Sequence, residues 1–169
     1  FQHSALFDSL PIWQNVAFGI MAQKRVSRKE AQSIAREKMS LVGLSPEIGD
    51  LFPADLSAGM QKRAGLARAI AGNPAIIFFD EPTTGLDPVM ADTINKLIVH
   101  INRVLGSTAL TITHDMASAK QIGDRIAMLH EGKIIWSGRP TDIEQSENAY
   151  LNQFVHGNTK GPIKMAIRA

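Results

Sequence analysis

The fold is decided by residues 75–82, which read AIIFFDEP. The apolar run from 75 to 79 shows no alternation, lies between Pro74 and a proline-containing turn, and therefore predicts a short strand buried on both faces. Two adjacent carboxylates, Asp80 and Glu81, follow that strand directly. They are expected at the carboxyl end of a parallel strand, where open α/β sheets bind their ligands.

The two carboxylates are suited to different tasks. Asp80 is placed to hold a Mg²⁺ ion, directly or through water, and Glu81 to orient and deprotonate an attacking water. The alternative is a polar strand end at which Pro82 simply makes a turn.

Capping signals on both sides of this stretch predict alternating helices and strands. Ser27, with Glu30 three residues later, opens one helix; Ser57 opens a second that runs to about residue 71. Asp87 and Pro88 open a third, which ends at residue 106. Strands are expected at 108–113 and 125–130, with a short helix between them and a hairpin from 125–130 to 133–136. This order indicates an α/β fold whose parallel strands are joined by crossover helices.

Composition narrows the class of protein. The chain has 169 residues, of which 44% are hydrophobic, enough to bury a core and too many for a disordered chain. No apolar run approaches the roughly 20 residues of a membrane span. Cysteine is absent, which excludes disulfides, thiolate zinc sites and cysteine nucleophiles. The net charge of +2 gives no reason to expect nucleic acid.

Two further segments are candidates for phosphate binding. Residues 56–60 precede a helix, whose unpaired N–H groups, positive dipole end and Gly59 make a seat for a phosphate; alternatively, Ser57 is only a cap. His114 follows a predicted strand and is placed to hydrogen-bond a phosphate oxygen, or is only a turn residue. Residues 85–88 are likewise either part of a site or no more than a helix start.

In chain order, these segments resemble the motifs of the ATP-binding-cassette (ABC) ATPase family. Gln2 resembles the Q-loop glutamine, residues 56–60 the signature loop, and 76–82 the Walker B strand with its catalytic glutamate. Residues 85–87 resemble the D-loop, and 113–115 the switch-histidine loop. The resemblance covers nearly the whole chain and is weakest beyond about Asn148.

The resemblance implies a partial P-loop NTPase (RecA-like) ABC core with a parallel sheet, plus an ABC helical subdomain. Residues 1–72 would form the Q-loop and helical subdomain with the signature motif, 73–147 the remainder of the core, and 148–169 a C-terminal extension. In such ATPases two subunits close head to tail on two ATP molecules. The roles carried over are catalysis by Glu81, His114 and Gln2; cofactor binding by Ser57, Ala58, Gly59, Met60 and Asp87; and Mg²⁺ binding by Asp80 and Gln2.

Two departures from the family pattern stand out. The signature usually reads Leu-Ser-Gly-Gly-Gln, whereas Ala58 and Met60 replace its first glycine and its glutamine; Met60 is a variant found among lipid-handling members. No Gly-x-x-x-x-Gly-Lys-Ser/Thr loop occurs in the chain. We therefore expect that loop upstream of Phe1, in an N-terminally truncated subunit, and we expect residues 1–169 alone not to hydrolyse ATP.

Residues 7–18 and 153–157 resemble importer-type cassettes, closest to those serving MCE-protein (Mla-type) phospholipid transport. The resemblance implies the ATP-hydrolysing motor subunit of a phospholipid transporter, peripheral to the cytoplasmic face of a bacterial inner membrane. Its implied partners are a second, identical ATPase subunit, transmembrane permease subunits, MCE-type lipid-binding proteins and small STAS-type regulators, with no nucleic acid. One alternative is a DNA-maintenance ABC ATPase, which the lack of heptads before the signature disfavours. The other is a noncatalytic interaction module.

Overall fold

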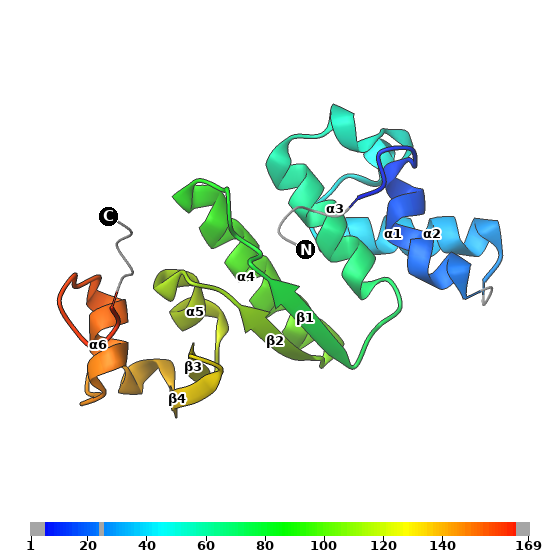
Figure 1. Ribbon diagram of the computed structural model, residues 1–169. Helices are drawn as coiled ribbons and strands as arrows, with labels where there is room; N and C mark the ends of the chain where they lie inside the picture. The colour runs from blue at the N-terminus through cyan, green and yellow to red at the C-terminus, as the bar shows by residue number, and fades with distance from the viewer. Residues whose placement is uncertain (1–5, 24–25, 165–169) are drawn as a thin grey trace. The chain divides into compact units, whose positions relative to one another are not determined.

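The computed structural model describes residues 6–23 and 26–164, whose elements fall into two compact units, Phe1–Thr113 and His114–Ala169. Figure 1 shows the helices and strands of both units. Gln2, assigned above to catalysis and metal binding, lies outside the described residues. None of the described helices combines the length and apolar character that crossing a membrane requires.

The first unit begins with a helical part. It consists of α1 (Ile12–Ala22), α2 (Arg28–Leu41), the short 3₁₀ turns η1 (Pro46–Asp50) and η2 (Pro53–Asp55), and α3 (Ala58–Ile70). Helix α1 packs against both α2 and α3, and the fully buried side chains between them include Ile12, Val16, Met39 and Ile70. The predicted cap at Ser27 is confirmed, because its side chain accepts from the N–H of Glu30 at 3.3 Å.

The rest of the first unit is a parallel strand pair joined by a crossover helix. Strands β1 (Ile76–Asp80) and β2 (Thr108–Ile112) pair in parallel, with Ile76 opposite Thr108, and α4 (Pro88–Leu105) connects them. Parallel neighbours need such a connection. Helix α4 buries Ile94, Ile98 and Ile101, and it ends at Gly106 in the left-handed region (φ 64°), as predicted.

The prediction that residues 75–79 form a wholly buried strand is wrong. Ile77 and Phe79 are buried, but Ile76 is 59% exposed and Phe78 is 73% exposed. Side chains of a strand alternate between the two faces of its sheet, and no described residue covers the second face of β1. The same face of the pair continues onto β2, where Leu110 and Ile112 are also exposed.

The second unit contains α5 (Met116–Ile122), β3 (Ile126–His130), β4 (Lys133–Gly138), a 3₁₀ turn η3 (Pro140–Asp142) and α6 (Ala149–His156). The predicted hairpin is confirmed: β3 and β4 are antiparallel, joined by Glu131 (φ 46°) and Gly132 (φ 76°). Two consecutive positive φ angles suit a tight hairpin turn. Within the described parts of the chain, β3 pairs with β4 alone and does not extend the parallel sheet.

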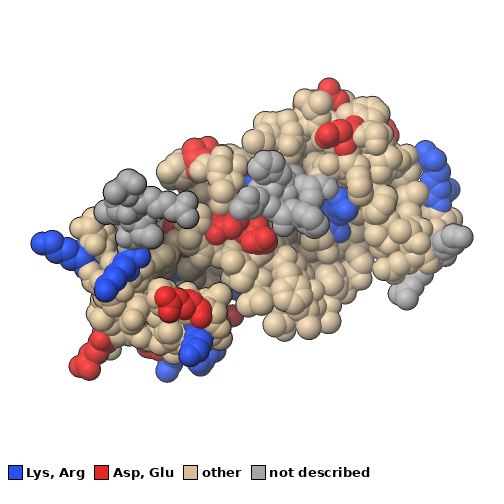
Figure 2. Space-filling model, viewed as in Figure 1, with Lys and Arg blue, Asp and Glu red and all other residues tan. Residues whose placement is uncertain are grey.

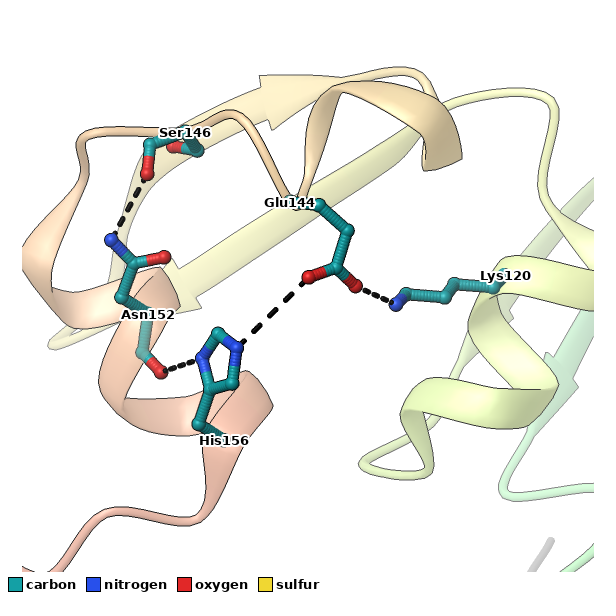
Figure 3. Close-up of polar contacts among 5 residues, drawn as sticks. All are labelled: Lys120, Glu144, Ser146, Asn152 and His156. Atoms are coloured by element: carbon teal, nitrogen blue, oxygen red, sulfur yellow. Dashed lines mark hydrogen bonds and ion pairs between the residues drawn. The ribbon is translucent and has the colours of Figure 1, made fainter.

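A polar cluster ties the segment after the hairpin to α5 and α6 (Figure 3). The Glu144 carboxylate receives the Lys120 ammonium at 2.6 Å, and His156 Nε2 lies 4.0 Å from its other oxygen. Asn152 donates to the Ser146 carbonyl at 3.0 Å. The hydrogen bond from Lys120 is the main reason that the pKa of Glu144 lies below its usual value.

Helix α6 also holds the chain that follows it. The amide of Gln153, 8% exposed, donates to the carbonyls of Asn158 and Ile163 at 3.2 and 3.0 Å. Its oxygen accepts from the N–H of Ile163 at 2.7 Å. The Gln153 side chain therefore holds the segment 158–163 against α6.

Candidate nucleotide site

The first part of the candidate site is the carboxyl end of β1. Asp80 is the last residue of the strand, is exposed, and lies in register with Ile112 at the end of β2. Glu81 continues the ladder by one bond, since its N–H donates to the Ile112 carbonyl at 2.9 Å. The structure thus confirms that both carboxylates leave the sheet at its carboxyl edge.

Glu81 has a strained backbone and a constrained side chain. Its φ of 48° lies in the left-handed region, which is uncommon for residues other than glycine and costs about 1–3 kcal/mol. Its Oε2 accepts a hydrogen bond of 2.7 Å from the Thr84 hydroxyl, and its carbonyl accepts from the Thr84 N–H at 3.3 Å. The turn that follows the strand therefore sets the direction of the Glu81 carboxylate.

The loop after Glu81 leads into α4. Thr83 is buried, its carbonyl accepts from the N–H of Leu86 at 3.2 Å, and Gly85 has φ 80°, where a side chain would be strained. Asp87 then caps α4, because Oδ1 accepts from the N–H groups of Val89 and Met90, each at 3.0 Å. Asp87 therefore fixes the start of the helix.

His114 follows Ile112 by two residues and is the first residue of the second unit, with an exposed side chain. Its neighbour Asp115 caps α5 by accepting from the N–H of Ala117 at 3.0 Å. Asp115 also accepts from the Ser118 hydroxyl at 2.6 Å, and that bond is the largest cause lowering the Asp115 pKa; the nearby charge of His114 acts in the same direction.

The signature loop forms the first turn of α3. Ser57 caps the helix by accepting from the N–H of Met60 at 3.3 Å, and both Ser57 and Ala58 are exposed. The first N–H groups of a helix have no partner in a preceding turn, and they carry the positive end of its dipole. Ala58 lies inside the helix and does not have a positive φ, so its methyl group brings no backbone strain. This geometry suits an anion.

Gly59 is buried and lies against α4. A Cβ atom built on Gly59 would overlap the terminal methyl of Met90. An adjoining pocket of about 320 Å³ is lined by Gly43, Leu44, Ser45, Ile48, Ser57, Gly59, Met60, Arg63 and Met90. Arg63, one of these lining residues, donates to the Gly43 carbonyl at 3.2 Å.

Asp80 suits magnesium as one ligand among several. In the described ranges, 6–23 and 26–164, no group of three or more acidic or histidine side chains is arranged to hold a metal ion. Mg²⁺ in nucleotide sites commonly takes one or two carboxylates and completes its shell with phosphate oxygens and water. The exposed Asp80 carboxylate, a hard oxygen donor at a strand end, fits that donor set.

Sequence reasoning did not identify Thr84, Met90 or Asn15. The contact of Thr84 with Glu81 depends on the turn after β1, and the contact of Met90 with Gly59 depends on how the helices pack. No sequence motif indicates either contact. Asn15 is fully buried in α1, where its oxygen accepts from the Phe7 N–H at 2.7 Å and its amide donates to the Phe7 and Leu10 carbonyls at 3.0 and 2.8 Å. It anchors the chain that leads into α1.

Comparison with known proteins identifies ATP-binding proteins of transport systems as relatives. The family profile described as ABC transporter matches residues 1–84. The "Probable ribonucleotide transport ATP-binding protein mkl" of Mycobacterium tuberculosis is 38% identical over 168 residues, covering 98% of this chain and 46% of the relative. The "Intermembrane phospholipid transport system ATP-binding protein MlaF" of Haemophilus influenzae is 36% identical over 164 residues, covering 97% of this chain and 62% of the relative. The chain thus spans about half the length of the curated relatives it matches.

A solved structure agrees with these sequence matches. The dimeric ATP-binding cassette MJ0796, described as a post-hydrolysis state bound to ADP and Pi, matches with a TM-score of 0.72 and 32% identity. The match covers 83% of this chain and 61% of that one. The α/β fold with its parallel strand pair is therefore an ABC cassette fold. From the family profile, the relatives and the fold together, we conclude that this chain belongs to the ABC transporter ATPase family.

Proposed function

We propose that this chain is part of the ATP-hydrolysing motor subunit of an ABC transporter that moves phospholipid. The observation that carries the ATPase part is Glu81. It stands at the end of β1 in a strained backbone conformation, with its carboxylate held by Thr84. Strain of this kind persists where the surrounding structure determines it, and it is concentrated at functional sites.

In this proposal Glu81 acts as the general base. When bound, MgATP supplies the phosphoanhydride bond that is hydrolysed. Glu81 orients the attacking water and accepts its proton, while the bond from Thr84 fixes the direction of the carboxylate. Asp80 would hold the magnesium ion together with Gln2, and His114 would donate a hydrogen bond to a phosphate oxygen. Positioning and charge account for catalysis here, and no protein nucleophile is needed.

The first turn of α3 would serve a second nucleotide, bound by a partner copy of the subunit. Ser57 would present its hydroxyl, and Ala58 and Gly59 their N–H groups, to its γ-phosphate. Met60, whose N–H is capped by Ser57, would complete the binding turn. Asp87 would help to align the two subunits. The dimeric state of the MJ0796 cassette supports this arrangement.

Phospholipid is the proposed cargo. The similarity to a relative named for intermembrane phospholipid transport supports it, although the mkl relative carries the name of ribonucleotide transport. The proposed partners are transmembrane permease subunits, MCE-type lipid-binding proteins and STAS-type regulators, with the subunit peripheral to the cytoplasmic face of a bacterial inner membrane. The described basic side chains form only small groups on the face shown in Figure 2, which gives no support to nucleic-acid binding.

The test of the ATPase proposal is Glu81→Gln in the full-length protein. Steady-state turnover of MgATP should fall by about 10²- to 10⁴-fold, because the base is lost, while ATP-dependent dimerisation survives. Glu131→Gln is the matched control: it makes the same change at a glutamate that also has a positive φ, in the hairpin turn. Unchanged turnover in Glu81→Gln would remove Glu81 from the base role.

Two further measurements test the proposed inactivity of residues 1–169 alone and the proposed phospholipid cargo. Residues 1–169 alone should not hydrolyse ATP, since this chain contains no phosphate-binding loop, and magnesium-dependent turnover by that piece would contradict us. For the cargo, the subunit would be co-purified with its permease and the bound lipid analysed by mass spectrometry. Absence of phospholipid from an active complex would overturn the assignment of cargo.

A further inference from the structure

The contact between Met90 and Gly59 joins two motifs within one chain. Met90 is in the first turn of α4, directly after the loop that ends at Asp87, and Gly59 is in the first turn of α3. The terminal methyl of Met90 occupies the place where a side chain of residue 59 would begin. Both residues lie in the first unit and both line the same pocket.

The cap residue Asp87 holds the backbone of Met90 in place. The Met90 N–H donates to Asp87 Oδ1 at 3.0 Å, so the cap that starts α4 also fixes the backbone from which the Met90 side chain extends. A continuous path therefore runs from the Asp87 carboxylate through Met90 to the signature glycine. We propose that Met90 is a positioning residue for the first turn of α3, called here the signature turn. Its side chain contacts this turn at the buried Gly59, and it places the turn according to the conformation of the loop that ends at Asp87.

The chemistry of the side chain suits this role. Methionine is unbranched and has a polarisable thioether, so it keeps contact with a neighbour that moves by small amounts. The pocket of about 320 Å³ beside it leaves room for such movement. Gly59 is buried whereas Ser57 and Ala58 are exposed, so Met90 contacts the turn at its buried residue.

This inference rests on the proposed function and predicts a particular kinetic effect. The signature turn would act on a nucleotide held by the partner subunit. Met90→Ala in the full-length protein should therefore lower kcat by about 10-fold through misplacement of the turn, and leave KM for ATP within about twofold. Met90→Leu conserves most of the volume and should recover most of the loss. Val89→Ala, at a neighbour that is 75% exposed, is the control.

A double-mutant cycle tests the contact itself. Gly59→Ala should lower kcat because its methyl group displaces that of Met90. Combining it with Met90→Ala should recover activity relative to Gly59→Ala, since the new methyl then fills the space that Met90 vacates. Losses that simply add would overturn the proposal.

A spectroscopic readout separates this inference from the ATPase proposal. In protein labelled with ¹³C-methyl methionine, the Met90 resonance is assigned by its disappearance in Met90→Leu. Gly59→Ala should shift it, and an unshifted resonance would overturn the contact whatever the activity. A wild-type protein without ATP turnover would instead overturn the proposed function and the kinetic role of Met90, while the spectrum still decides whether the contact exists.

Discussion

Replacing the buried amide of Asn15 by an isosteric carboxyl group should loosen the start of α1. Asn15 is fully buried and donates to the carbonyls of Phe7 and Leu10 at 3.0 and 2.8 Å. In Asn15→Asp at pH 7 the Leu10 carbonyl loses its side-chain donor, the Phe7 carbonyl keeps only the Leu10 N–H, and both face a buried negative charge. The unsatisfied carbonyl costs roughly 1–3 kcal/mol and the buried charge adds to this, so the free energy of local opening should fall by about 3–5 kcal/mol.

The pH dependence of this loss has a definite sign. The introduced carboxyl group is desolvated and faces two carbonyl oxygens, and both effects raise its pKa; the hydrogen bond from the Phe7 N–H acts in the opposite direction. Because the site is fully buried, we expect the folded-state pKa to lie above the unfolded value of about 3.9. A raised folded pKa means that the variant is least impaired below pH 4, where the neutral acid still donates one hydrogen bond, and loses stability as the pH rises.

Hydrogen exchange of residues 7–22, followed by mass spectrometry in the full-length protein, measures the opening. The matched control is Gln14→Glu, which makes the same chemical change at a half-buried position of the same helix and should cost under about 0.5 kcal/mol. If Asn15→Asp protects this segment as well as the wild type does at pH 7, the amide does not donate as described and the reasoning fails.

Three further predictions concern single contacts. Thr84→Val removes the 2.7 Å bond to the Glu81 carboxylate and should lower ATP turnover about 10-fold, whereas Thr84→Ser should restore it; equal rates in both would show that the hydroxyl is not needed. Gln153→Leu should release the segment 158–163, which faster amide exchange there would reveal. Lys120→Met should raise the pKa of Glu144 in an NMR titration. Because the wild-type pKa is lowered, the contribution of this pair to stability is present above the unfolded pKa of Glu144 and is lost as the pH falls.

The helices and strands could be predicted where local chemistry determines them. The caps at Ser27, Ser57 and Asp87 each accept from an N–H two or three residues later, so the signal and the structure it makes lie within one turn of chain. The hairpin at Glu131-Gly132 is equally local. Asp80 and Glu81 could be placed because a strand fixes where its last residue points.

Burial could not be predicted in the same way. The apolar run at 75–79 indicates that both faces of the strand avoid water, yet Phe78 remains 73% exposed among the described residues. Composition records the environment that a side chain favours, whereas exposure depends on which other segments cover it. Thr84 and Met90 could not be predicted for a related reason. Their contacts depend on how the chain turns and packs, and neither residue stands at a sequence spacing that is typical of a known motif.

The two glutamates with positive φ show how a strained residue is to be interpreted. Glu131 (φ 46°) is followed by Gly132 (φ 76°) in a tight hairpin, where the twist of the strands requires left-handed residues, so the turn alone explains it. Glu81 (φ 48°) follows a parallel strand, and no hairpin demands its conformation. The φ angle describes rotation about the N–Cα bond of Glu81. The N–H at one end of this bond donates to the Ile112 carbonyl, and the carboxylate carried by the Cα at the other end accepts from Thr84. The strain at Glu81 thus accompanies the fixing of one carboxylate, which is the property that a general base requires.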